Sequence, residues 1–260
     1  MHRVIVNADD FGITEGVTEG IVEAIKFGAV TNTTAMVCVE GAVERLRNWG
    51  PLVRGRVGAH LQLTTGRPLT PRSLTPSLAD ASGWFHGSKH MAAESPVEEI
   101  VLEWEAQLAA IRDAGIEADH IDSHHHVHKF PNPFLAFCEL ALRHNLPARA
   151  TGVSMANRLR QSGIACPDVI LLDYYGADLS EGRLLSLLAD ATAGAAVPWT
   201  VEVMCHPGNS CPSLARLSNY VEDRDRELAT LRRPALKSAL AVRGFALAAY
   251  GGLAAVARSV

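Results

Sequence analysis

Strand-like and helix-like segments alternate along most of this 260-residue chain, and this alternation is the strongest constraint on its fold. Parallel strands need a crossover connection, usually a helix, so the pattern predicts parallel βαβ units. The expected strands are residues 3–8, 32–39, 56–63, 118–123, 148–153, 168–173, 199–205 and 244–249. The expected helices are roughly residues 15–27, 40–48, 96–114, 133–144, 179–193, and 222 onward.

Seven or eight such units predict an α/β fold that is (β/α) barrel-like, with mostly parallel strands. An active site is then expected at the carboxyl ends of those strands. An open doubly wound sheet is the alternative, and the absence of a GxGxxG or Walker-type loop counts against it. We expect one domain over residues 1–260. The stretch 64–95, rich in Pro, Ser and Gly, interrupts the alternation and is expected to be a lid-like insertion.

Composition narrows the classes of function. The formal net charge is -4 and no basic run occurs, which argues against a nucleic-acid or anionic-membrane partner. No membrane span is expected, because Lys237 and Arg243 interrupt the most apolar stretch, residues 235–257. Five cysteines without a CxxC pair suit reduced thiols, and the first strand begins too early for a signal peptide. We therefore expect a cytoplasmic protein.

Polar residues gather where the expected strands end. The sequence VNADDFGIT, residues 6–14, places Asp9 and Asp10 together at the end of the first strand. Two adjacent buried carboxylates are costly unless a cation lies nearby. The carboxyl ends of parallel strands share one face, so residues from other strands are expected to join this pair. They are His60, Asp122, His124, His126, His128 and His206.

This set of residue types predicts a divalent metal. Imidazole with carboxylate is the ligand set of zinc and other first-row ions, whereas more oxygen ligands and water suit magnesium. A metal with open positions fits hydrolysis, in which one aspartate ligates and the other takes a proton from water. His206 is a candidate to protonate a leaving amine. The stretch HIDSHHHVHKFP would place His124, His126 and His128 on one side if the strand continued, whereas a loop would allow any of them to face inward.

A purely structural role is an alternative for three of these residues. Asp10 would only cap the first helix, His60 would be a core histidine bonded to backbone, and His206 would belong to a His-Pro-Gly turn. The sequence also leaves open which further side chains contact a substrate. The candidates are His126, His128, Trp84, Phe85 and Arg67.

Five motifs together carry a resemblance to a known family. VNADDFGIT, GAVTNTTAMV, GAHLQLTTGRPLT, HIDSHHHVHKFP and VEVMCHPGN occur in this order, and the whole resembles the YdjC-like carbohydrate deacetylases, the family of the chitooligosaccharide monodeacetylases. The resemblance implies a barrel-like enzyme, often a homodimer, that uses a divalent metal (Mg²⁺ or Zn²⁺). It implies removal of an acetyl group from an N-acetylated sugar, as in chitin breakdown.

The resemblance also implies roles for five residues. Asp9 matches the catalytic base, and His206 of the His-Pro motif matches a candidate acid. Asp10, His60 and His124 match the metal ligands.

Two departures from the family pattern concern substrate fit more than chemistry. Asn32 stands where serine is frequent, and Gln62 stands where asparagine is common. Some relatives are associated with hopanoid biosynthesis, so deacetylation of a glycolipid or hopanoid-pathway intermediate is an alternative. A metal-dependent phosphoesterase or other amidohydrolase and a non-catalytic sugar- or metal-binding protein are the other hypotheses.

Overall fold

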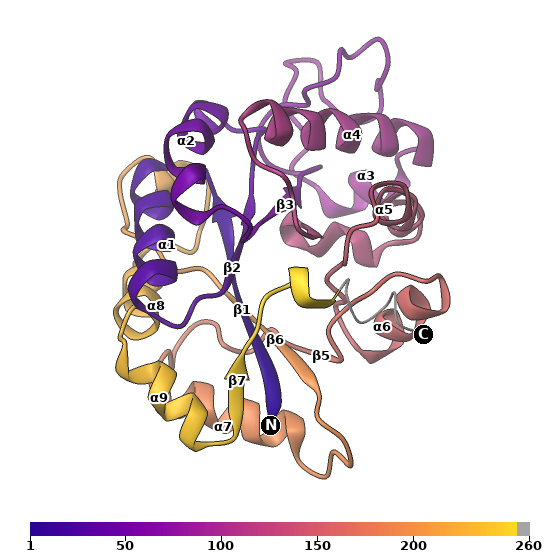
Figure 1. Cartoon of the computed structure of the whole chain (residues 1–260). Coiled ribbons are helices and arrows are strands. Elements are labelled where there is room, and N and C mark those ends of the chain that lie inside the picture. The colour runs from indigo at the N-terminus through magenta and orange to yellow at the C-terminus, as the bar shows by residue number, and fades with distance from the viewer. Residues whose placement is uncertain (254–260) are drawn as a thin grey trace.

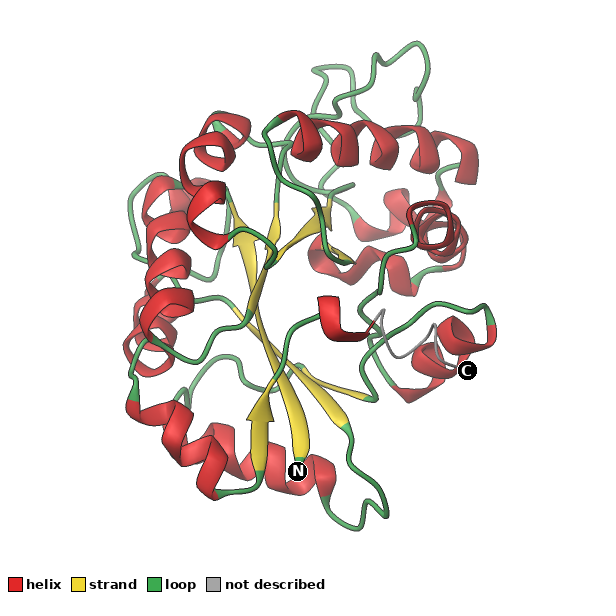
Figure 2. Cartoon of the chain, viewed as in Figure 1, coloured by secondary structure: helices red, strands yellow, loops and turns green. Residues whose placement is uncertain are grey.

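The computed structural model describes residues 1–253 of the chain, and there it consists of parallel strands surrounded by helices (Figures 1 and 2). The strands are β1 (His2–Phe11), β2 (Asn32–Ala35), β3 (Val57–Leu61), β4 (Ile121–Ser123), β5 (Val169–Leu171), β6 (Thr200–Cys205) and β7 (Phe245–Leu247). The α-helices are α1 (Glu15–Phe27), α2 (Ala42–Trp49), α3 (Lys89–Glu94), α4 (Val97–Asp113), α5 (Pro131–His144), α6 (Val153–Gln161), α7 (Glu181–Thr192), α8 (Glu222–Leu231) and α9 (Ala235–Val242). Short 3₁₀ turns are η1 (Gly50–Val53), η2 (His124–Lys129) and η3 (Leu214–Arg216).

The strands form one curled sheet in the order β4-β3-β2-β1-β6-β5, with β7 paired to the beginning of β1. All of the pairings are parallel, so the carboxyl ends of β1, β2, β3, β4 and β6 lie at one end of the sheet. Helices cover its outer face, as Figure 2 shows in red. The barrel-like α/β fold predicted from the alternation is therefore confirmed, as a half-barrel of seven parallel strands in the described residues.

The predicted strand over residues 148–153 is wrong. Only one bridge forms there, between Ala148 and Ile121, and the helix α6 begins at Val153. The amide of Ala148 donates to the carbonyl of Ala165 (2.9 Å), and that of Arg149 donates to Ile121 (3.0 Å). This segment thus continues the sheet beyond β4 for a single step, and the Arg149 side chain that follows the bridge is buried.

The local sequence explains how the first strand and helix, β1 and α1, form and end. The strand β1 is rich in β-branched residues and is buried from Val4 to Phe11, as expected for a central strand covered on both faces. The Thr14 side chain accepts a hydrogen bond from the Val17 amide (3.3 Å) and is the N-cap of α1. Gly28 ends that helix where an added Cβ would lie 1.9 Å from the Leu231 carbonyl, so only glycine fits.

The segment 64–95 is fixed on α4. The buried Glu103 carboxylate accepts hydrogen bonds from the amides of Leu69 (3.1 Å) and Thr70 (2.9 Å). Phe85 is buried within the core cluster, and Lys89–Glu94 forms α3. That this segment acts as a lid stays a prediction.

In the described part of the chain, no helix has the length and apolar character needed to cross a bilayer. All five cysteines are free thiols, in agreement with the prediction from their number and spacing.

Candidate metal centre

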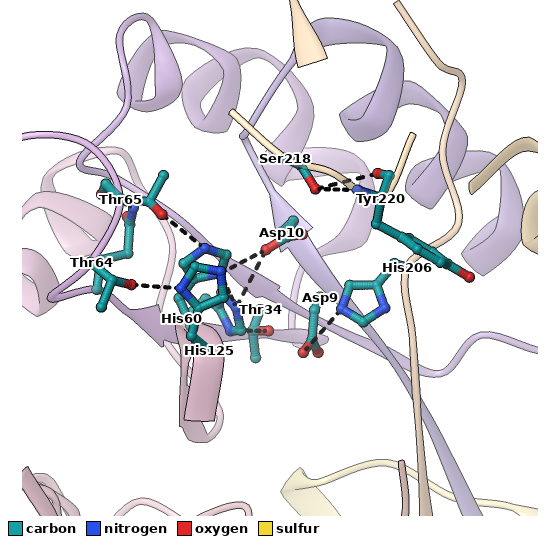
Figure 3. A network of polar contacts seen from close by, with 12 residues as sticks. Asp9, Asp10, Thr34, His60, Thr64, Thr65, His125, His206, Ser218 and Tyr220 are labelled. Atoms are coloured by element: carbon teal, nitrogen blue, oxygen red, sulfur yellow. Dashed lines mark hydrogen bonds and ion pairs between the residues drawn. The ribbon is translucent and has the colours of Figure 1, made fainter. Parts of the chain in front are cut away.

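The end of β1 departs from regular strand geometry at the two adjacent aspartates. The register with β2 shifts between Ala8 and Phe11, and Asp10 has a left-handed backbone with φ of 72°. Aspartate tolerates this conformation better than most residues. Because of the shift, Asp9 and Asp10 both lie in one cluster instead of pointing to opposite faces (Figure 3).

Three donor atoms converge beside this kink. His60 Nε2 lies 3.4 Å from Asp10 Oδ1, His124 Nδ1 lies 3.3 Å from the same oxygen, and the two ring nitrogens are 3.2 Å apart. Donors bound to one small divalent ion at tetrahedral or octahedral angles lie about 3.0–3.4 Å from one another. The residues predicted as ligands, Asp10, His60 and His124, are therefore brought together with the spacing that such an ion requires.

Outer hydrogen bonds orient both imidazoles toward the shared point. His60 Nδ1 lies 2.6 Å from Asp122 Oδ1, so this nitrogen donates to the carboxylate and Nε2 is left as the free lone pair. His124 Nε2 lies 3.1 Å from Thr65 Oγ1, and in the tautomer that donates to this hydroxyl the lone pair of Nδ1 is free. A second partner that fixes the ring and tautomer is typical of metal-binding histidines.

The charge of the cluster fits a cation. The buried carboxyl groups outnumber the two buried arginines, Arg149 and Arg224. Burial lowers the pKa of His60, but Asp122 and Asp10 outweigh this effect and raise it to about 10, so without an ion the ring holds a proton on Nε2 that a bound cation would displace. Asp10 Oδ1 is buried without a hydrogen-bond donor, which is costly unless a cation or water meets it. The carboxyl groups are those of Asp9, Asp10, Asp122 and Glu202.

The two adjacent aspartates have different arginine partners. Arg224 lies 2.6 Å from Asp10 Oδ2, on the oxygen that does not face the imidazoles. Arg149 forms a two-pronged contact with Asp9, at 2.7 Å to each oxygen. Burial raises the pKa of Asp9, but the Arg149 guanidinium outweighs burial and holds it below its usual range. Asp9 is therefore ionised at neutral pH and fixed in position.

The geometry also indicates which oxygen of Asp9 is available to accept a proton. Oδ1 already accepts from Arg149 and from Asn7 Nδ2 (3.0 Å), whereas Oδ2 accepts from Arg149 alone among these groups. His206 Nε2 lies 4.0 Å from Oδ2. The free lone pair of Asp9 is thus on the side of His206 and can meet a water or substrate there.

His206 directly follows β6 and lies beside Asp9 (Figure 3), with 15% of its side chain exposed. Burial lowers its pKa to about 4, although Asp9 opposes the effect, so the ring is neutral at neutral pH. Glu227 accepts a hydrogen bond from the His206 amide (2.5 Å) and another from the Tyr220 hydroxyl (2.6 Å). Burial raises the pKa of Glu227 to about 8.

The histidine-rich stretch turns immediately after His124. His125 and His126 have left-handed backbones, with φ of 57° and 53°, so the strand does not continue and the loop reading is correct. His125 Nδ1 bonds to Thr64 Oγ1 (2.9 Å) and takes no part in the triangle of donor atoms. His128 is buried, 2.5 Å from Ser123 Oγ and stacked on Phe137, so it is a core residue.

The sequence analysis did not identify the two arginines that bind the aspartates of the site, Arg149 and Arg224. Arg149 lies in the segment wrongly predicted as a strand, and Arg224 lies in a charged helical stretch that reads as solvent-exposed. Both side chains are almost fully buried. No local pattern marks either residue, because each is recruited through contacts with strands far away in the sequence. For Arg149, the one available signal was a lone arginine near the beginning of a predicted strand.

The fold and the cluster together define a class, namely a barrel-like α/β protein with an Asp–His–His constellation at the carboxyl ends of its parallel strands. The chain matches the model of the YdjC-like protein family over residues 3–242, and it belongs to that family. The predicted family is therefore confirmed.

Curated relatives cover nearly the whole chain. A protein of Geobacillus stearothermophilus named carbohydrate deacetylase is 38% identical, over 95% of this chain and 96% of the relative. A protein of Proteus mirabilis named chitooligosaccharide deacetylase is 37% identical, over 97% of this chain and 99% of the relative.

Solved structures show the same fold. The crystal structure of a putative cellobiose-phosphate cleavage protein from Enterococcus faecalis has a TM-score of 0.87 and 34% identity, with 97% of this chain and 98% of that chain covered. A family 4 carbohydrate esterase from Streptomyces lividans has a TM-score of 0.51 and 13% identity, over 95% of this chain and 91% of that one. At that identity the second likeness concerns the fold alone.

Proposed function

We propose that this protein is a metal-dependent carbohydrate deacetylase that hydrolyses the acetamido group of an N-acetylated sugar. The observation that carries the proposal is the triangle of donor atoms from Asp10, His60 and His124, with the fixed carboxylate of Asp9 beside it. The names of the curated relatives support a carbohydrate substrate, and one of them supports short chitin oligomers.

The donor triangle would hold the cation. Two imidazoles and one carboxylate suit Zn²⁺, and Mg²⁺ would need additional water ligands. Such an ion supplies a Lewis acid that polarises the acetyl carbonyl and lowers the pKa of water.

The protein's own groups would manage the protons. Asp9 accepts a proton from the attacking water through Oδ2, and Arg149 keeps this carboxylate ionised and oriented beforehand. Water adds to the carbonyl carbon, the C–N bond breaks, and the nitrogen leaves with the sugar as an amine. His206 donates a proton to that nitrogen. Because His206 is neutral before the reaction, it gains this proton during the reaction, and Asp9 at 4.0 Å is a carrier within reach.

Acetate release from short chitin oligomers, their phosphates and other N-acetyl glycosides, with and without chelator, tests the proposal. We expect Asp9→Asn to lower turnover by about 10²–10⁴-fold, the usual contribution of general-base catalysis, while metal content stays the same. Asp113→Asn is the matched control, because Asp113 is exposed at the end of α4. Full activity in Asp9→Asn would remove the base assignment. Oligomer binding without acetate release by the wild-type protein would favour a binding protein.

The proposal includes a cytoplasmic homodimer: the family resemblance implies the dimer, and the composition predicts the compartment. Light scattering on the purified protein tests the dimer, and a mass of one chain would contradict it.

A further inference from the structure

Three aromatic rings from three separate connections meet beside Asp9. Tyr175, after β5, stacks on Tyr220, which precedes α8, with ring centroids 4.1 Å apart and planes 17° apart. The His206 ring meets both of them edge-on, at 5.7 Å from Tyr175 and 5.6 Å from Tyr220. The stacked tyrosines therefore form a wall along one side of the proposed proton donor (Figure 3 shows His206 with Tyr220).

Buried polar groups fix this wall in place. The Tyr220 hydroxyl donates to Glu227 (2.6 Å), and the same carboxyl group accepts from the His206 amide. Arg224 Nε donates to the Tyr220 carbonyl (2.8 Å), while its other nitrogen contacts Asp10. The wall is thus tied directly to the proposed metal ligand and to the backbone of His206, so its position relative to the reaction is fixed.

Tyr175 is the exposed member of the pair. One face of its ring lies on Tyr220, and 50% of the residue remains exposed to solvent. Burial raises the pKa of the Tyr175 hydroxyl. A large, pre-ordered aromatic surface with one polar end is what carbohydrate C–H faces pack against, at little cost in side-chain entropy.

The chemistry determines which part of the substrate meets this wall. In an N-acetylated sugar the amide nitrogen is bonded to the ring, and the acetyl group lies on the other side of the scissile bond. The residue that protonates the nitrogen must therefore face the sugar. Because Tyr175 and Tyr220 flank His206, they lie on the sugar side, while the donor triangle lies on the acetyl side.

We propose that Tyr175, supported from behind by Tyr220, stacks on a pyranose ring of the substrate and is a specificity-determining residue for carbohydrate substrates. This inference rests on the proposed deacetylase function. It adds a platform that recognises the sugar ring itself, independent of the acetyl group that the metal centre would bind.

The test compares Tyr175→Ala with Tyr175→Phe, which keeps the ring and removes only the hydroxyl. For acetate release from triacetylchitotriose, we expect Tyr175→Ala to raise KM about tenfold and to change kcat less than about twofold, since stacked aromatic contacts have roughly this magnitude. Tyr175→Phe should retain the low KM. Phe27→Ala is the control for loss of an exposed aromatic, because Phe27 is 59% exposed at the end of α1.

Calorimetric binding of triacetylchitotriose to Asp9→Asn, with and without Tyr175→Ala, separates this inference from the proposed function. If the wild-type protein releases no acetate but Tyr175→Ala weakens binding about tenfold, the proposed deacetylase function is wrong and the proposed stacking on Tyr175 is supported. Equal binding with and without the Tyr175 ring would contradict the proposed stacking. The proposal would also be wrong if neither protein bound the trisaccharide, or if Tyr175→Phe bound it as weakly as Tyr175→Ala.

Discussion

Replacement of His124 by asparagine should abolish most of the stabilisation that a divalent ion gives this protein. An ion that binds only the folded state at 100 times its dissociation constant stabilises it by about 2.7 kcal/mol. Loss of one of the three donors, whose atoms lie 3.2 to 3.4 Å apart, should weaken binding at least about 100-fold. At the same ion concentration, about 0.4 kcal/mol of stabilisation then remains.

For a chain of this length, 1 kcal/mol corresponds to roughly 2–4 °C in Tm. The difference in Tm with Zn²⁺ and with chelator should therefore fall from about 5–11 °C in the wild-type protein to about 1–2 °C in His124→Asn. Differential scanning calorimetry measures both values without any need for substrate. His125→Asn is the matched control, since its histidine is adjacent but bonds to Thr64, and asparagine tolerates the left-handed backbone there. An undiminished metal-dependent shift in His124→Asn, or an equal loss in His125→Asn, would refute the assignment of the donor triangle.

Two further predictions concern groups around the site. Thr65→Val removes the hydroxyl 3.1 Å from His124 Nε2 and should weaken metal binding about 10–100-fold, as measured by metal titration calorimetry. Unchanged metal affinity would show that the Thr65 hydroxyl does not orient His124 for binding. Glu227, whose pKa burial raises from 4.5 to about 8, stays protonated between these values in the folded state and ionises when unfolded. Stability should therefore fall as pH rises through this window, by at most about 1.4 kcal/mol per pH unit. Glu227→Gln should flatten this slope in denaturant unfolding at pH 5.5 and 7.5, and equal slopes in both proteins would contradict the assignment.

The fold could be predicted because the signals that specify it are local. The first unit shows this clearly, with a β-branched run in β1, a helix capped by Thr14 and a breaker at Gly28. Parallel connection of such units dictates that their carboxyl ends meet, which is why Asp10, His60 and His124 could be grouped from sequence although over a hundred positions separate the first from the last. Where the local signal was weak, as in residues 148–153, the prediction was wrong.

The environment of the site could not be predicted because it depends on contacts between distant segments. Arg149 reaches Asp9 across 140 positions, and Arg224 reaches Asp10 across 214. Burial of an arginine is unfavourable unless carboxylates surround it, and nothing in the neighbouring sequence reveals those partners. The histidine stretch likewise offers five imidazoles, and the left-handed turn at His125 and His126 decides that His124 alone joins the donor triangle.

The shift in β1 gives two adjacent aspartates different environments, and the proposed chemistry depends on this division. In a regular strand Asp9 and Asp10 would point to opposite faces, and one of them would leave the site. With a left-handed backbone at Asp10, its carboxylate reaches His60 and His124, while that of Asp9 stays with Arg149. One carboxylate then faces the proposed cation and the other remains a free base one residue away. A cation held by the first carboxylate would polarise a water, and the backbone fixes the second carboxylate one residue away to take its proton.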